Sequence, residues 1–192
     1  MLHDLASAWR PAVTLGVAMF AITGLAYPAL VTGVAQTVLP YQAGGSLIVD
    51  GGRVVGSALI GQGFTRAGYF HGRPSAAGSG HDAMASAGSN LGPGAQALHD
   101  RVQASVAALQ AGGETGPIAA DRVTASASGL DPHLSPAAAL AQVPRIAGAR
   151  GLPEPRVQAL VDAAIENPCL GIAGDPVVNV LALNRELDKL KG

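Results

Sequence analysis

The stretch that decides the fold is PAVTLGVAMFAITGLAYPALVTGVAQTVL, residues 11–39, which contains no charged side chain. About 20 consecutive apolar residues are enough for a helix to cross the hydrocarbon core of a bilayer, and this run is longer. A cleaved signal peptide is the alternative, because Gly24-Leu25-Ala26 resembles a small-residue cleavage site. The run is too long for the apolar region of a signal peptide, so we predict a retained transmembrane helix.

The orientation of this helix follows from the few charges that precede it. Residues 1–10 carry Arg10 and the amino terminus against Asp4. The positive-inside rule then favours a cytoplasmic amino terminus and a single pass through the inner (plasma) membrane. Residues 40–192 are therefore predicted to form one soluble, extracytoplasmic domain. Pro28 is expected to kink the helix, because proline cannot donate the backbone hydrogen bond of a helix interior.

The composition excludes several classes of function. Twelve Lys and Arg residues against thirteen Asp and Glu residues leave a formal net charge of −1, so no basic face remains for nucleic acid. The single cysteine, Cys169, excludes an internal disulfide bond and a zinc site built from thiolates. All aromatic residues lie in the first 70 positions, so the domain core beyond them must consist of Val, Leu, Ile and Ala. They are Trp9, Phe20, Tyr27, Tyr41, Phe64, Tyr69 and Phe70.

The patterning of the domain predicts a mixed α/β (α+β) fold. Alternating apolar residues around Gly51-Gly52 predict a β-hairpin. Leu98, Val102, Val106 and Leu109 lie on one stripe of a predicted helix over residues 95–110. Ser135 is a predicted N-cap for a helix that reaches Ala149 and is interrupted at Pro144. The remaining predicted elements are a helix over residues 154–166, a strand over residues 176–183 and a short helix over residues 185–190.

Motifs that would carry catalysis are missing from the sequence. The only lysines are Lys189 and Lys191, which excludes a Walker A loop. No serine stands in a Gly-x-Ser-x-Gly nucleophile elbow. The histidines at 71, 81, 99 and 133 lack the close spacing of a helix-borne metal site. We therefore predict neither catalytic nor metal-binding residues, and no enzyme activity of the chain itself.

One loop has the residue types of a contact surface. The segment YFHGRP, residues 69–74, combines two aromatics, a basic pair and a rigid proline before a tract rich in Gly and Ser. Aromatics and Arg dominate interface hot spots, which favours a contact with a partner over a flexible linker or a phosphate loop. The alternative is that Tyr69 and Phe70 fill a core that is poor in aromatics.

Four blocks of sequence carry a family resemblance. They are YFHGRPSAAG (69–78), SNLGPG (89–94), DRVTASASGLDPHLSPAAALAQVPRIA (121–147) and LGIAGDPVVNVLALN (170–184). Together, behind one amino-terminal helix, they resemble the C subunit family of the Kdp potassium-transporting ATPases. The resemblance implies an accessory subunit with no cofactor of its own, which assists assembly and acts as a catalytic chaperone that raises the ATP affinity of the ATPase subunit. The implied partners are the ATP-hydrolysing P-type subunit, the potassium-channel-like subunit and the lipid bilayer.

The resemblance also supplies the candidate partner-contact residues. They are Tyr69, Phe70, His71, Gly72, Arg73, Pro74, Ser89, Asn90, Leu91, Gly92, Pro93, Ser128, Gly129, Leu130, Asp131, Pro132 and His133. The resemblance implies contact with ATP only in a ternary complex with the ATPase subunit. An extracytoplasmic domain would not reach ATP in the cytoplasm, so this implication conflicts with the predicted orientation. Two other functions stay open at this point: a membrane-anchored extracytoplasmic module that binds or senses a ligand, and a membrane-anchored hydrolase.

Overall fold

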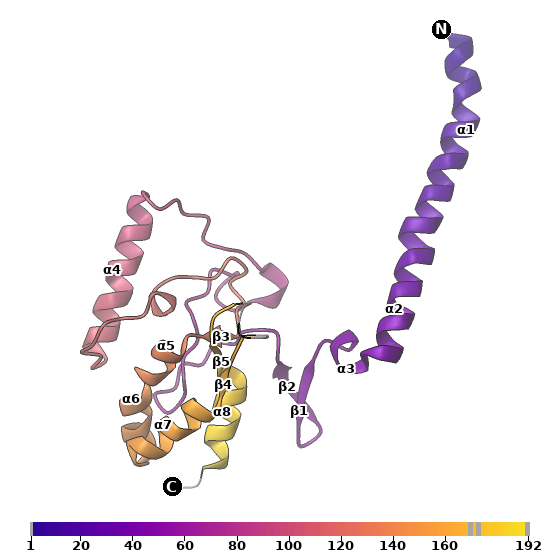
Figure 1. Cartoon of the computed structure of the whole chain (residues 1–192). Helices are drawn as coiled ribbons and strands as arrows, with labels where there is room; N and C mark the ends of the chain where they lie inside the picture. Colours follow the sequence, from indigo (N-terminus) through magenta and orange to yellow (C-terminus); the bar gives the residue numbers. More distant parts are fainter. Residues whose placement is uncertain (1, 169–170, 172–173, 191–192) are drawn as a thin grey trace. The chain divides into compact units, whose positions relative to one another are not determined.

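The computed structural model describes residues 2–168, 171 and 174–190, so Cys169 lies outside the described residues. The chain divides into two compact units, Met1–Leu47 and Ile48–Gly192. Figure 1 shows the first unit as one long helix and the second as helices and short strands. The expected fold class, one amino-terminal helix followed by an α+β domain, is confirmed.

The first unit is helical almost throughout. It consists of α1 (Leu2–Phe20), a π-helical turn η1 (Ala21–Ala26), α2 (Tyr27–Val38) and the short α3 (Pro40–Ala43). The apolar stretch Ser7–Val38 covers 32 residues, none of which is buried against other parts of the chain. At about 1.5 Å per residue this helix is about 48 Å long, more than the hydrocarbon core of a bilayer. Length and composition therefore make it one candidate membrane span.

The π-helical turn lies where Pro28 disturbs the helix. Proline has no N–H to donate to the carbonyl of Gly24, four residues earlier, and its ring crowds that carbonyl. The helix widens instead, and the N–H of Tyr27 donates to the carbonyl oxygen of Ile22, five residues earlier. The kink that the sequence predicts is thus a local widening of the helix.

The second unit contains two small sheets. β1 (Leu47–Asp50) and β2 (Arg53–Ser57) form the predicted hairpin. β3 (His133–Leu134), β5 (Val177–Asn179) and β4 (Ile165–Glu166) form an antiparallel sheet with β5 in the centre. Val178 of the central strand pairs with Leu134 on one side and Ile165 on the other.

The second unit also contains several helices, and all but the first of them lie near this sheet (Figure 1). They are α4 (Gln96–Ala111), α5 (Pro136–Leu140), α6 (Val143–Arg150), α7 (Glu154–Ala163) and α8 (Val180–Lys189), with short 3₁₀ turns η2 (Ala83–Ala85) and η3 (Ala120–Arg122). The hydroxyl of Ser135 accepts from the N–H of Ala138, which confirms the predicted N-cap of α5. Pro144 lies in the first turn of α6, so the predicted interruption is real.

The core is aliphatic with one exception. Phe70 is the only aromatic among the fully buried residues that the structure describes, and it packs with side chains of β3, β5 and the helices α5 to α8. The aliphatic members are Leu134, Ala138, Ala139, Val143, Ile146, Ala147, Leu152, Val157, Val161, Val178, Val180, Leu183 and Leu187. This confirms the expectation from the position of the aromatics in the sequence.

Two predicted boundaries were wrong. The predicted strand over residues 176–183 ends at Asn179, because the side chain of Asn179 accepts from the N–H of Ala182 and caps α8. The closing helix therefore begins at Val180 rather than at Arg185. The helix expected over residues 154–166 ends at Ala163, and its last two residues instead form β4 against β5.

Candidate partner-contact site

Two buried amide side chains hold the segment Tyr69–His71 against the helices. Asn184 of α8 accepts from the N–H of Phe70 at 2.8 Å and donates to its carbonyl oxygen at 2.9 Å. Gln142, just before α6, accepts from the N–H of His71 at 2.8 Å and donates to its carbonyl oxygen at 3.0 Å. Each amide thus replaces the partner strand that an extended segment would otherwise need.

The two aromatics of this segment have different surroundings. The side chain of Phe70 is fully buried in the core. Tyr69 is half-buried, and its hydroxyl lies 3.1 Å from a carboxylate oxygen of Asp188. The guanidinium of Arg150 stacks 4.6 Å from the centre of the Tyr69 ring and pairs with the same Asp188 at 2.7 Å. The side chain of Phe70 therefore serves the core, while Tyr69 stays accessible at its edge.

The Gly- and Ser-rich tract that follows is packed against a second loop. We call residues 71–88 and 124–133 the loop pair. The hydroxyl of Ser75 donates to the carbonyl oxygen of Gly129 at 2.7 Å and accepts from the N–H of Ala77 and of His81. Farther along, the N–H of Ala87 donates to the carbonyl oxygen of Ser128 at 3.1 Å. The tract is therefore a fixed part of the domain and not a linker.

Glycine makes this close approach possible. Gly129 has φ of +68°, and a Cβ atom there would lie 2.7 Å from the backbone nitrogen of Ala77 and 2.7 Å from the carbonyl oxygen of Ala87. A Cβ on Gly88 would lie 2.8 Å from the carbonyl oxygen of Ala127. No side chain fits between the two loops at these positions.

An ion pair closes the outer edge of the loop pair. Arg73 and Asp131 are in contact at 2.9 Å, with about a quarter of each side chain exposed. The Arg73 guanidinium also donates to the carbonyl oxygen of Thr124 at 3.4 Å. Asp131 accepts from the N–H of His133 at 3.0 Å. Arg73, Asp131 and His133 line an open hollow of about 380 Å³ together with Asp121.

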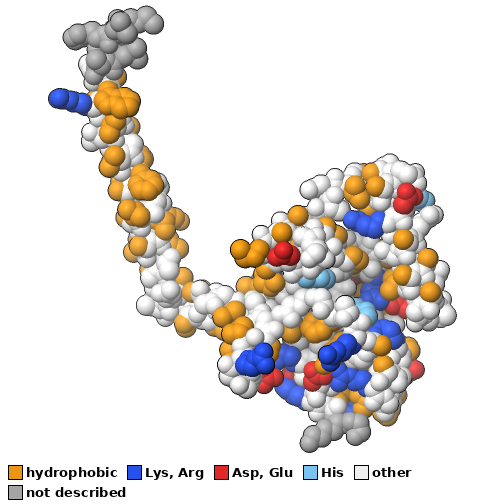
Figure 2. Space-filling view, turned by 180° about the vertical axis from the view of Figure 1, so that it is seen from behind, with side chains coloured by type: hydrophobic (Ala, Val, Ile, Leu, Met, Phe, Trp, Pro, Cys, Tyr) orange, Lys and Arg blue, Asp and Glu red, His pale blue; other side chains and the backbone are white. Residues whose placement is uncertain are grey.

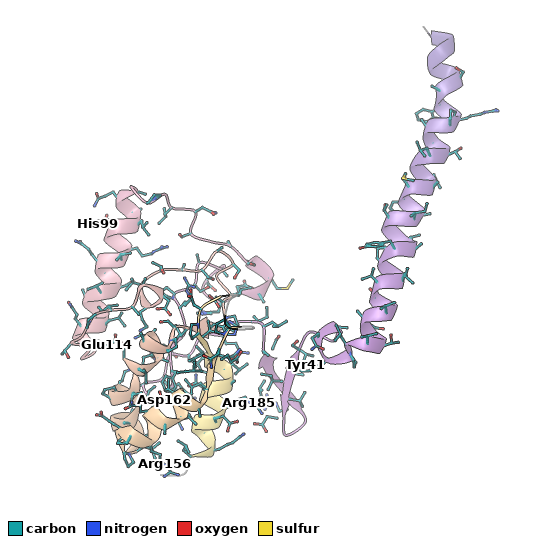
Figure 3. All side chains as sticks on the ribbon, in the orientation of Figure 1. Tyr41, His99, Glu114, Arg156, Asp162 and Arg185 are labelled. Carbon is teal, nitrogen blue, oxygen red and sulfur yellow. The ribbon has the colours of Figure 1, made fainter. Side chains whose placement is uncertain are left out.

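The third tract, Ser89–Pro93, leads from the loop pair toward α4. Ser89 accepts a long hydrogen bond, 3.4 Å, from the guanidinium of Arg101 on that helix. Asn90 has φ of +52°, a left-handed conformation that asparagine tolerates better than most residues. The apolar stripe predicted on α4 is half-buried, while the residues opposite it, among them the labelled His99 in Figure 3, are exposed.

Burial separates the predicted contact residues into two groups. Phe70, Gly129, Leu130 and Pro132 are buried, Phe70 in the hydrophobic core and the other three within the loop pair. The others are half-buried or exposed, namely Tyr69, His71, Gly72, Arg73, Pro74, Ser89, Asn90, Leu91, Gly92, Pro93, Ser128, Asp131 and His133. The structure thus brings residues 71–75 and 128–133 together at one surface.

The charges beneath this surface are arranged around His71. Burial lowers the pKa of His71, and the nearby guanidinium groups of Arg145 and Arg122 lower this pKa further. The carbonyl oxygen of Arg66, 3.0 Å from Nε2 of His71, opposes this shift in part. Arg122 pairs with Glu114, the carboxylate labelled after α4 in Figure 3. The lowered pKa favours the neutral imidazole of His71.

The polar side chains of this site are largely engaged within the domain. Within the described residues, no three His, Cys, Asp or Glu side chains come close enough together to hold a metal ion. The polar groups of the loop pair bond mainly to each other and to backbone, with Arg73, Asp131 and His133 partly open to solvent. Such an arrangement gives a surface whose side chains are already held in place by their own hydrogen bonds.

Sequence reasoning missed the residues that hold the site in place. Asn184 and Gln142 lie 114 and 71 residues from the backbone that they bind. Asn184 is the lone amide of the apolar stretch LALN, and Gln142 is the lone amide of ALAQV. This pattern was the one signal in the sequence that could have indicated their role. An amide in an apolar run is buried only when its hydrogen bonds are satisfied.

Comparison with known proteins identifies the family. The family model for the c chain of the K⁺-transporting ATPase, KdpC, matches residues 9–189. The chain is 58% identical over 180 residues to the potassium-transporting ATPase KdpC subunit of Caulobacter vibrioides, covering 93% of this chain and 91% of that protein. It is also 53% identical over 189 residues to the potassium-transporting ATPase KdpC subunit of Myxococcus xanthus. That match covers 97% of this chain and 90% of that protein. These matches include both the apolar helix and the domain with its loop pair, so the chain belongs to the KdpC family of potassium-transporting ATPase subunits.

Proposed function

We propose that the protein is a non-catalytic accessory subunit of an ATP-driven, high-affinity potassium uptake complex. The observation that carries the proposal is the family match over residues 9–189, which includes the membrane helix as well as the domain. The partners are then the ATP-hydrolysing P-type subunit and the channel-like subunit of the same complex. The fixed surface of the loop pair is suited to bind such a partner, because its backbone is already ordered before contact.

The finer role that we propose is to assist assembly and to raise the affinity of the ATPase subunit for ATP. Five hollows among the described residues of the domain are open, with volumes of about 210 to 410 Å³. These volumes lie below or near the lower end of the range of about 300–1,000 Å³ that is typical of ligand pockets. In this proposal the chain has no cofactor of its own and meets ATP, if at all, only together with the ATPase subunit.

The test is purification with a tag on this chain, in mild detergent, from cells grown in low potassium. An accessory subunit is expected to bring the two larger subunits with it. The complex that lacks this chain is expected to hydrolyse ATP with a higher KM for ATP. A chain that purifies alone would instead support the membrane-anchored binding or sensing module, and an unchanged KM would contradict the chaperone role.

The orientation is tested by labelling an exposed residue of the domain. Positive charge at Arg10 and the amino terminus supports the proposal of a cytoplasmic amino terminus and an extracytoplasmic domain. With Cys169→Ser as background, a cysteine at the exposed Gln103 of α4 is expected to react with a membrane-impermeant thiol reagent in spheroplasts. Labelling only after lysis would place the domain in the cytoplasm and make direct contact with ATP feasible.

The contact role of the loop pair is tested at Arg73. Its ion pair with Asp131 is partly exposed, and such pairs contribute only about 0–1 kcal/mol to folding. Arg73→Ala is therefore expected to change domain stability little but to reduce recovery of the other subunits several-fold, since Arg is a common hot-spot residue. Copurification and thermal unfolding of the same preparations measure the two effects.

The matched control is Arg150→Ala. Arg150 is also an arginine paired with an aspartate, Asp188, and one fifth of its side chain is exposed, but it lies outside the predicted contact residues. Equal recovery of the subunits with both variants, or normal recovery with Arg73→Ala, would exclude Arg73 from the contact.

A further inference from the structure

Arg101 lies within the apolar stripe of α4. The half-buried residues of this helix occur at positions 98, 101, 102, 105, 106 and 109, which is the spacing of one helical face. Leu and Val occupy four of these positions, and Arg101 and Ser105 occupy the other two. The helix therefore carries a guanidinium where the pattern favours an aliphatic side chain.

The guanidinium of Arg101 has only one weak partner among the residues that the structure describes. One of its terminal nitrogens donates to the hydroxyl of Ser89 at 3.4 Å, which is longer than an ordinary N–H···O hydrogen bond. Its Nε atom is buried and has no acceptor. No Asp or Glu of the described chain forms an ion pair with it. A partly buried cation with so few partners lowers the stability of the fold.

This lack of a counter-charge does not come from a shortage of acids. The chain has thirteen Asp and Glu residues against twelve Lys and Arg residues, and Figure 2 shows the two kinds interspersed on one face of the domain. The acids nearest to Arg101 in the sequence have other partners. Asp100 accepts from Gln96 at 2.7 Å, and Glu114 pairs with Arg122.

Ser89 places this arginine beside the proposed contact surface. It directly follows residue 88, the last residue of the first loop of the loop pair. Its hydroxyl accepts from Arg101 but donates to no acceptor among the described residues, so its hydrogen is available. A guanidinium N–H and a neighbouring O–H are two donors that suit the two oxygens of a carboxylate. Both residues are partly open to solvent.

We propose that Arg101 and Ser89 bind a carboxylate of another subunit, an Asp or Glu side chain that completes the ion pair missing from this chain. The contact surface then extends from the loop pair onto α4. This inference rests on the proposed accessory function, because it requires a partner subunit. A single carboxylate suits the site better than a phosphate-bearing ligand, since α4 carries no other Lys or Arg.

The experiment uses the complex purified through a tag on this chain, with the substitution Arg101→Lys. Carbodiimide then joins an amine and a carboxylate that are in contact, and peptide mapping by mass spectrometry locates the bond. Because the chain has only two lysines of its own, Lys189 and Lys191, a bond at position 101 is readily identified. The matched control is Gln103→Lys, at an exposed position of the same helix about 200° around its axis.

Arg101→Lys is expected to give several-fold more crosslink to an Asp or Glu of another subunit than Gln103→Lys gives. If the other subunits copurify but crosslinking at position 101 is no greater than at 103, or reaches only this chain, the carboxylate site is overturned. If the unsubstituted chain brings no other subunit with it, the accessory function itself fails, and this inference fails with it.

A second variant separates a contact role from a role in folding. Arg101→Met keeps the length of the side chain and removes the uncompensated charge, so the thermal midpoint of the full chain in detergent is expected to stay the same or rise. Recovery of the other subunits is expected to fall several-fold. A lowered midpoint would show that Arg101 serves the fold, and unchanged recovery would show that no partner needs it; either result would overturn the proposal.

Discussion

Phe70→Ala is expected to lower the free energy of unfolding of the domain by ~3–5 kcal/mol, the usual cost of removing a buried aromatic ring. Phe70 is fully buried, and the rest of the core that the structure describes is aliphatic. The surrounding side chains come from several helices and two strands, so they cannot all move inward to fill the space. Asn184 and Gln142 still hold the backbone on either side, which prevents the segment from collapsing into the cavity.

The measurement is urea unfolding of the detergent-solubilised chain, followed by circular dichroism. The matched control is Phe64→Ala, which removes the same side chain from the edge of the core, where Phe64 is only partly buried. Phe64→Ala is expected to lower the free energy of unfolding by about half as much as Phe70→Ala or less, because it removes less buried apolar area. A loss at Phe70 no larger than at Phe64 would show that Phe70 is not the centre of this core.

The features predictable from the sequence are those with a local cause. The long apolar run, the two-glycine hairpin, the Ser135 N-cap and the interruption at Pro144 each depend on a few neighbouring residues. The aliphatic core also followed from the sequence, because every aromatic lies before residue 71. Such features need no knowledge of contacts between distant parts of the chain.

The errors arose where an apolar run fits two structures. Residues 176–183 are mostly Val, Leu and Ala, and a run of eight such residues does not separate a strand from a buried helix by its period. The strand ends at Asn179, because the side chain of this residue caps α8. At the other boundary, Ile165 leaves the helical pattern because it pairs with Val178 of the distant β5.

For the candidate site, the sequence indicated the segment but not its division of roles. Tyr69 and Phe70 are adjacent aromatics, yet one borders solvent and the other is in the core. In an extended segment neighbouring side chains point to opposite sides, so one of the two had to be buried. The structure buries Phe70, and its backbone is held by Asn184, a residue 114 positions later. The density of Gly and Ser is explained by close packing of the loop pair.

That packing leads to the second large effect, at Gly129. Gly129→Ala is expected to destabilise the domain by ~2–5 kcal/mol. A residue with a Cβ atom pays ~1–2 kcal/mol to adopt the left-handed conformation, and Gly129 has φ of +68°. The added methyl group would also meet backbone atoms of Ala77 and Ala87 at 2.7 Å. Backbone atoms cannot rotate away, so the two loops must separate, at a further cost of ~1–3 kcal/mol.

A comparison with Gly151→Ala separates these two causes. Gly151 ends α6 with φ of +64°, almost the value at Gly129, but no heavy atom lies within 4 Å of the position of its Cβ. The control variant is therefore expected to lose only the conformational part, ~1–2 kcal/mol. Urea unfolding of both variants in the same detergent gives the difference between them. Equal losses at Gly129 and Gly151 would mean that the loop pair yields without cost, and that its packing does not fix the proposed contact surface.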